Sequence, residues 1–394
     1  MVPATTGPFG SLIRPDFGYF DTNKTIYLDN AGTAQKPRCV LQSLVKSYTD
    51  TNAPIGRSIY SLAEQATTHY ETARAHIAQL HSVDPAEIIF TYSATDSINC
   101  VYYAWARHAI TAGDEIIISV LEHSSNVICW QELAREKQAQ LIIITMTPEY
   151  TLDYAQLEKS ISARTKLIAL THTSHVVGSH TDIARVTRAA KKYTIPVLID
   201  ASQAVAHTQL TINALDIDFL VYSGHKIGAP LGIGVLYINK RRHAEIAQYR
   251  MGGGAIDREI PHRLEAGSPP GPAAHALATA LTYQYTLMSQ GDLTLYQAQL
   301  CAQFIEGVKN IPGLTLFGSP AELSKTGHLI SFTIDTMHPH DIAAYLSQHQ
   351  IAVRAGYHCA PLLGINSVRL SVYAYTTPED IDACITALKS LRTF

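Results

Sequence analysis

The sequence contains few cysteines, and no two of them lie close together. Six occur among 394 residues, and the closest two, Cys359 and Cys384, are 25 positions apart. This spacing excludes CxxC redox motifs and zinc ribbons, and six cysteines are too few for a disulfide framework in a chain of this length. We therefore expect a reducing, cytoplasmic location.

Long apolar runs and an excess of positive charge are also lacking. No stretch approaches the roughly 20 apolar residues of a membrane helix, and residues 1–20 lack the basic and apolar regions of a signal peptide. Lysine and arginine number 30 against 33 acidic residues, and the two signs are mixed along the chain. We expect a soluble protein with no membrane and no nucleic-acid partner, because nothing suggests a basic stripe for phosphodiesters.

Short apolar runs alternate with helical patterns through the first two thirds of the chain. The runs cover residues 87–92, 115–121, 140–145, 166–172, 196–200, 218–223 and 234–239. They are rich in Ile, Leu and Val with little polar alternation, which is typical of strands buried on both faces. The pattern predicts an α/β fold with a mostly parallel sheet covered by helices.

The composition changes after about Gly252. A crossing rich in Gly and Pro leads into a helix, and short strand and helix patterns then alternate to the end of the chain. We expect three parts: an N-terminal segment (1–25) that packs with a small domain, a large domain (26–260), and a linking helix with the small C-terminal α+β domain (261–394). A chain of this length is expected to form more than one domain.

Polar side chains follow four of the predicted strands. Asp200 ends the run 196–200, Ser223, His225 and Lys226 close the run 218–223, His123 follows 115–121, and Ala94 and Thr95 open a helix after 87–92. Ligands of open α/β sheets bind beyond the carboxyl ends of the strands. The sequence therefore predicts one ligand site built from these residues.

This set of residues suits pyridoxal phosphate. The aldehyde of that cofactor needs a lysine for a Schiff base, which fits Lys226. Its ring nitrogen needs a carboxylate, which fits Asp200, and its flat ring needs a flat neighbour, which fits His123. Its phosphate suits a helix N-terminus with nearby donors, here the Ala94–Thr95 turn with Ser223 and His225. Each residue alone has an ordinary explanation, such as a helix cap for Asp200, but their joint occurrence in this order favours the cofactor.

Four motifs carry a resemblance to a known family. HTSHVVGSHTDI, LIDASQAVAH, YSGHKIGAPLGIGVLY and VRAGYHCAP resemble class V, fold-type I pyridoxal-phosphate enzymes, in particular Suf-type cysteine desulfurases and selenocysteine lyases. The resemblance runs from YLDNAGTAQKP at residues 27–37 to the last helix. It implies a seven-stranded large domain with a small C-terminal domain, and a homodimer with its active site near the subunit interface. It also implies that Gln203 contacts the phenolic oxygen of the cofactor.

The same resemblance implies an activity. A cysteine desulfurase converts L-cysteine to L-alanine and leaves a persulfide on an enzyme cysteine, here Cys359, for transfer to a sulfur-acceptor protein. The attacking sulfur must be a thiolate on an exposed loop, and Lys226 and His123 are the other catalytic candidates. Arg369 is the candidate clamp for the substrate carboxylate, with Arg354 and Arg57 as further substrate-binding candidates.

Several positions depart from the family pattern. Ala94 replaces a threonine, His175 replaces an asparagine beside the cofactor ring, GRSIY at 56–60 replaces H-R-G-x-H, and Ser268 in EAGSPPGP replaces the threonine that binds the partner subunit's phosphate. Cys359 and Arg369 are only ten positions apart, which is short for the Suf type and predicts a less mobile Cys359. Because these changes cluster around the substrate, they affect the choice of substrate more than the cofactor.

Two other classes of function remain open from the sequence. One is a C–S or C–Se lyase, or another class V enzyme that performs transamination or epimerisation on a specialised amino acid. The other is a cofactor-holding scaffold subunit without turnover. The histidines of HTSHVVGSH have no zinc-like spacing, so we expect no metal site.

Overall fold

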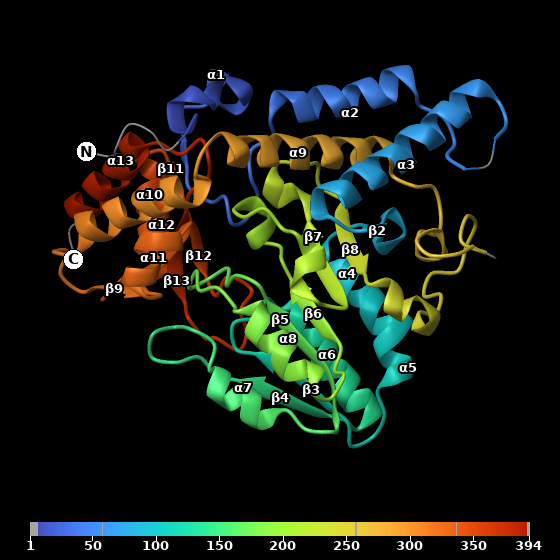
Figure 1. The fold of residues 1–394 in the computed structure, drawn as a ribbon. Helices are drawn as coiled ribbons and strands as arrows, with labels where there is room; N and C mark the ends of the chain where they lie inside the picture. Colours follow the sequence, from blue (N-terminus) through green and yellow to red (C-terminus); the bar gives the residue numbers. More distant parts are fainter. Residues whose placement is uncertain (1–6, 57, 257, 336, 392–394) are drawn as a thin grey trace.

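A seven-stranded sheet forms the centre of the large domain in the computed structural model, which describes residues 7–56, 58–256, 258–335 and 337–391 (Figure 1). Its strands are β2 (Ile88–Thr91), β3 (Glu115–Ser119), β4 (Gln140–Ile144), β5 (Thr165–Thr171), β6 (Val197–Asp200), β7 (Phe219–Ser223) and β8 (Gly234–Ile238). Their order is β2-β8-β7-β6-β5-β3-β4, with β8 antiparallel to both neighbours and the other pairs parallel. Each predicted apolar run forms one strand, so the predicted mostly parallel sheet is confirmed.

Helices cover both faces of this sheet because successive strand side chains point to opposite sides. On β3, Ile116 and Ile118 pack with Trp130 of α6, whereas Ile117 faces the core that contains Ile183 of α8. The helices are α1 (Tyr19–Thr22), α2 (Arg38–Asp50), α3 (Ser61–His81), α4 (Ala94–Val101), α5 (Arg107–Ala109), α6 (Ser125–Lys137), α7 (Tyr154–Ser160), α8 (Ile183–Lys191), α9 (Gly271–Gln290), α10 (Leu293–Val308), α11 (Pro320–Thr326), α12 (Pro339–Gln348) and α13 (Pro378–Ser390). Among the described residues, no helix has the length and apolar character needed to cross a membrane.

A second, four-stranded sheet lies beyond α9, at the left of Figure 1. It contains β9 (Leu314–Phe317), β10 (Leu329–Ile334), β12 (Arg354–Gly356) and β13 (Ser367–Ser371), all antiparallel, and α10 to α13 belong to the same part of the chain. The N-terminal segment contacts this part, because Gly10 N–H donates to the Ala374 carbonyl (2.7 Å). β1 (Ile26–Tyr27), at the start of the range predicted for the large domain, pairs with β11 (Ile351–Ala352) of the same C-terminal part. The first contact agrees with the division made from the sequence and the second crosses its boundary at residue 26, so the division stays a prediction.

The sheet directions bring five strand ends to one edge. Strands β2, β7, β6, β5 and β3 all run the same way, and β8 starts at Gly234 beside their carboxyl ends. A side chain at Gly234 would meet the Ser93 backbone at 2.8 Å, so the close approach of β8 to the turn between β2 and α4 requires glycine. The polar residues that follow the strands therefore gather at one place.

Candidate active site

A cavity of about 250 Å³ lies at this edge of the large sheet. Residues predicted from the sequence line it together: Ala94, Thr95, His123, His175, Asp200, Gln203, Ser223, His225, Lys226, Arg354, Cys359 and Arg369. Ala31, Gly32 and Ser202 complete part of its wall. Strand ends of the large sheet thus meet two arginines and a cysteine of the small domain at one cavity.

Lys226 stands on a short 3-10 helix, Gly224–Ile227, directly after β7. Gly228 ends this turn with φ +83°, and a side chain there would meet Pro37 at 2.8 Å. Burial lowers the pKa of Lys226 to about 8, and Asp200 opposes the shift. A share of the amine is therefore neutral near pH 7.5, which is the nucleophilic form.

Asp200 and His123 provide a carboxylate and a flat ring. Asp200 ends β6, is 5% exposed, and accepts a hydrogen bond from Ser202 N–H at 2.9 Å. The Nδ1 atom of His123 accepts from Ser125 N–H at 3.2 Å, so the neutral ring carries its proton on Nε2. Burial, followed by the charge of Lys226, lowers the pKa of His123 to about 4, so this ring is neutral at physiological pH.

The N-terminus of α4 faces the same cavity. Ser93 caps the helix by accepting from Asp96 N–H at 3.2 Å, and Ala94 N–H donates to Ser223 Oγ at 2.9 Å. Thr95 is exposed in the first turn. The Nδ1 atom of His225 is buried and has no partner among the described residues. A helix start with polar side chains nearby suits a phosphate.

Gln203 also lines the cavity, and its side chain is already bound on one side. Its Nε2 donates to the Ala31 carbonyl at 3.0 Å, and the residue is 4% exposed. The amide is therefore held in place by the segment before α2. Its contact with the phenolic oxygen of the cofactor stays a prediction.

Arg369 is held at the cavity by contacts on both sides. It lies in β13 and is 2% exposed; its Nη1 donates to the His175 carbonyl (2.9 Å) and its Nη2 to Asp29 Oδ1 (3.2 Å). Burial lowers the pKa of Arg369 to about 10, against the effect of Asp29. Arg354 stands directly opposite Arg369 on β12, and both residues line the cavity.

Cys359 is the exposed cysteine of the cavity wall. It lies in the loop between β12 and β13, and Arg354 Nη2 is 3.9 Å from its Sγ. Burial raises the pKa of each other cysteine: Cys39, Cys100, Cys129, Cys301 and Cys384. Cys359 is thus the exposed cysteine, whereas the other five are buried or half-buried, and their raised pKa disfavours the reactive thiolate.

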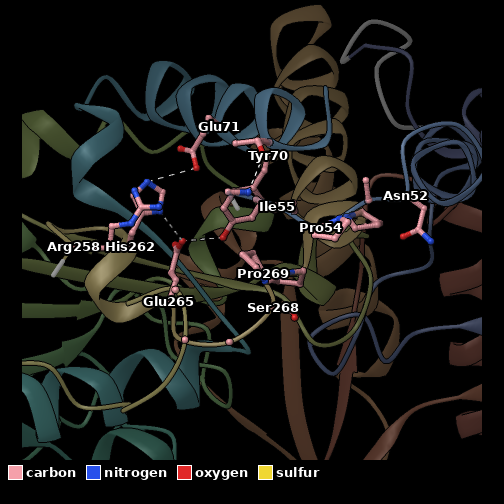
Figure 2. Close-up of a pocket in the computed structure, with 18 of the residues that line it drawn as sticks. Asn52, Pro54, Ile55, Tyr70, Glu71, Arg258, His262, Glu265, Ser268 and Pro269 are labelled. Atoms are coloured by element: carbon pink, nitrogen blue, oxygen red, sulfur yellow. Dashed lines mark hydrogen bonds and ion pairs between the residues drawn. The ribbon is translucent and has the colours of Figure 1, made fainter. Parts of the chain in front are cut away.

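Ser268 lies in another cavity, of about 730 Å³, between α3 and the segment that precedes α9 (Figure 2). Glu265, three residues earlier, accepts hydrogen bonds from Tyr70 Oη at 2.9 Å and Arg74 Nη1 at 2.7 Å, which fixes this segment. Ser268 itself is exposed and does not line the cavity of Lys226. Within a single chain, Ser268 therefore lies apart from the other predicted site residues. The remaining predicted residue, Arg57, lies outside the described residues.

Comparison with known proteins identifies the family. The Aminotransferase class-V pattern matches residues 26–384. The chain belongs to the class-V aminotransferase family. Its relatives include a cysteine desulfurase of Serratia proteamaculans, 36% identical over 93% of both chains, and a probable cysteine desulfurase of Synechocystis, 33% identical over 100% of this chain and 98% of the other.

Two solved structures of cysteine desulfurases superpose on nearly the whole chain. The apo cysteine desulfurase of Thermococcus onnurineus NA1 has a TM-score of 0.90 at 31% identity and covers 97% of this chain and 99% of its own. The cysteine desulfurase CsdA of Escherichia coli has a TM-score of 0.87 at 30% identity and covers 96% of both chains. The fold-type I architecture predicted from the motifs is confirmed.

Class-V aminotransferases are pyridoxal-phosphate enzymes, and this chain is one of them. The cavity fits the group: it joins an amine, a carboxylate and a helix start, and His225 Nδ1, Ser202 Oγ and Arg369 Nε are buried without partners within the described ranges. Buried polar atoms are rarely left unpaired, so these three mark places where a polar ligand is expected.

Sequence reasoning missed several residues that support the site. Asp29 pairs with Arg369, Ser125 orients His123, and the buried Glu122 underlies the turn that carries His123. Asp29 lies within YLDNAGTAQKP, which marked the family but gave no sign of this long-range ion pair. The described residues contain no group of three or more His, Cys, Asp or Glu arranged to hold a metal ion.

Proposed function

We propose that this protein is a pyridoxal-phosphate-dependent cysteine desulfurase that converts L-cysteine to L-alanine and leaves a persulfide on Cys359. The observation that carries the proposal is the exposed Cys359 beside Lys226 and Arg369 in one cavity. Relatives along the whole chain bear the name cysteine desulfurase, which supports the same reaction.

The cofactor supplies an electron sink for bonds that break at the α and β carbons of an amino acid bound to it. Lys226 would hold the cofactor, and its amine, with a pKa of about 8, would accept and return the Cα proton. Asp200 would keep the cofactor ring nitrogen protonated, and the neutral His123 would stack on the ring. Arg369 would bind the substrate carboxylate through its fork of N–H donors.

Cys359 performs the sulfur step in this proposal. Its thiolate attacks the sulfur of the substrate, so an S–S bond forms while the bond from that sulfur to the β carbon breaks. The electron pair of the broken bond stays on the β carbon, which takes up a proton and becomes the methyl group of alanine. Atoms and electrons balance in this reaction: L-cysteine and a Cys359 thiol give L-alanine and a Cys359 persulfide.

A product assay tests the function. With L-cysteine and a reductant, the wild type should release alanine and sulfide in equal amounts, and peptide mass spectrometry without reductant should find the extra sulfur on Cys359. The Cys359→Ala variant should carry no label, and its rate of alanine formation should fall at least about tenfold, because the substitution removes the nucleophile. Cys39→Ala is the matched control and should behave like the wild type. An unlabelled Cys359 in the wild type would refute the assignment.

A second candidate function is a C–S or C–Se lyase, or another class V reaction on a specialised amino acid. His175, in place of the asparagine of the family pattern, lines the cavity and favours a changed substrate. The same assay separates the candidates, because a lyase yields pyruvate and ammonia, and a transaminase yields a keto acid, instead of alanine.

The assembly is also part of the proposal. We infer a cytoplasmic homodimer in which Ser268 reaches the phosphate site of the partner subunit, and a sulfur-acceptor protein that takes the persulfide sulfur. The exposed apolar residues Leu41, Val45 and Tyr48 on α2 support a covered surface next to the cavity that contains Ser268. Light scattering after size exclusion should give twice the mass of one chain, and a single-chain mass would refute the dimer.

A further inference from the structure

The side chain and the backbone of His175 make contacts in two directions. Its Nε2 lies 2.9 Å from the His358 carbonyl oxygen, so Nε2 carries the proton and donates it. Its own carbonyl accepts from Arg369 Nη1 at 2.9 Å. Burial lowers the pKa of His175 well below its usual value, so the ring stays neutral and keeps this tautomer. One residue thus contacts both the loop of Cys359 and the candidate carboxylate clamp.

The loop that receives this hydrogen bond has an unusual backbone. His358 and Cys359 both have positive φ, 51° and 59°, which is the left-handed region that residues with side chains rarely adopt. Such conformations persist only when the surroundings hold them. Here the Cys359 carbonyl accepts from Ser124 N–H at 2.8 Å, and the His358 ring lies 2.9 Å from Ser367 Oγ. The His175 bond is the third contact of this set.

His175 is itself fixed firmly enough to hold the loop. Ser174 Oγ accepts from Val176 N–H at 3.3 Å and Val177 N–H at 3.2 Å, and Ser331 Oγ donates to the Val176 carbonyl at 2.6 Å. Val176 and Val177 are buried in one apolar cluster with Ala360, the residue after Cys359. The segment of His175 and the loop therefore form one packed unit.

We propose that His175 is a positioning residue for sulfur transfer: its imidazole holds the left-handed turn of His358 and Cys359, so that the sulfur stays at the cavity mouth while the backbone of His175 holds Arg369. The inference rests on the proposed function for its catalytic consequence. It assigns a specific role to a cavity residue that departs from the family pattern.

Two substitutions separate the positioning contact from a general packing effect. The amide nitrogen of glutamine reaches about the place of imidazole Nε2, so His175→Gln keeps the donor to the His358 carbonyl. The amide of asparagine ends near the place of Nδ1, so His175→Asn loses that donor. Both variants retain a neutral polar side chain. Absorbance of bound pyridoxal phosphate and thermal melting check that both variants fold and bind the cofactor.

The readouts are single-turnover labelling of Cys359 with L-cysteine and alkylation of Cys359 by iodoacetamide without substrate. His175→Asn should slow persulfide formation about tenfold, the size expected for one buried hydrogen bond, and speed alkylation severalfold as the turn loosens. The rates of persulfide formation and of alkylation in His175→Gln should both stay within about twofold of those of the wild type. Equal behaviour of the two variants would overturn the inference. If the wild type forms no persulfide, the proposed function fails, whereas the alkylation contrast still decides the positioning role.

Discussion

A buried carboxyl group beneath the site is held by neutral partners. Glu122 is 0% exposed; its Oε1 lies 2.6 Å from Ser119 Oγ, and its Oε2 accepts from Asn126 Nδ2 at 2.7 Å. Burial raises the pKa of Glu122 to about 8, and the negative charge of Asp200 acts in the same direction. Glu122 is therefore a neutral acid at physiological pH, and it holds the turn of His123 through hydrogen bonds instead of charge.

We predict that Glu122→Gln removes a pH dependence of stability. Between pH 4.5 and pH 8 the folded protein keeps the Glu122 proton while the unfolded chain releases it, so this group makes the free energy of unfolding fall as pH rises. One proton corresponds to at most about 1.4 kcal/mol per pH unit. Glutamine has the shape of the protonated acid and can donate to Ser119 and accept from Asn126. In urea unfolding, the free energy of unfolding of Glu122→Gln relative to that of the wild type should be higher at pH 8 than at pH 5.

A matched control is Glu259→Gln, because the Glu259 side chain is 93% exposed. Its unfolding curves should change with pH as those of the wild type do. Parallel pH profiles for Glu122→Gln and the wild type would show that Glu122 is ionised in the folded protein.

At the scale of elements, the strands of the large sheet could be predicted because both of its faces are buried, except at the edge strand β4. Every strand is then a continuous apolar run that the composition reveals, and Asp200 or Lys226 stands out where such a run ends. The contacts between distant elements could not be predicted. The pairing of Arg354 opposite Arg369 depends on the register of β12 with β13, and the bond from His175 to His358 joins residues 183 positions apart.

The segment before α9 is held by one such distant contact, and we predict that it is a stability determinant. Glu265 binds Arg74 with both side chains nearly buried, 5% and 2% exposed, and also accepts from Phe90 N–H at 2.7 Å. Glu265→Gln removes the buried counter-charge of Arg74 and leaves only the partly exposed Glu71 beside the guanidinium, so it should cost up to about 3–5 kcal/mol in urea unfolding. Glu132→Gln breaks the exposed pair with Arg135 and should cost less than about 1 kcal/mol. Similar losses for the two variants would contradict a structural task for Glu265.

At the scale of the whole molecule, many histidines are buried in their neutral form. Away from the cofactor cavity, burial lowers the pKa of His81 and His172 to about 4 and that of His207 to about 3, and it lowers the pKa of His328 well below its usual value. His328 stacks on His207 with ring centroids 3.8 Å apart, and neither nitrogen of His328 has a partner among the residues described. Protonating His328 would place a charge in a buried site where no hydrogen-bond partner among the described residues stabilises it.

We predict a steep loss of stability in mild acid that has its source in these residues. Below pH 6.5 these histidines bind protons in the unfolded chain but stay neutral in the folded protein. The free energy of unfolding therefore falls as the pH drops from 6.5 toward 4, by up to about 1.4 kcal/mol per pH unit for each histidine. His328→Leu removes one of these protons and an unpaired buried imidazole, so its urea unfolding, measured on cofactor-free protein, should depend less on pH. The exposed His349→Gln should follow the wild type. If His328→Leu keeps the wild-type slope from pH 6.5 to pH 4.5, the core histidine is protonated in the folded protein, and the acid sensitivity has another source.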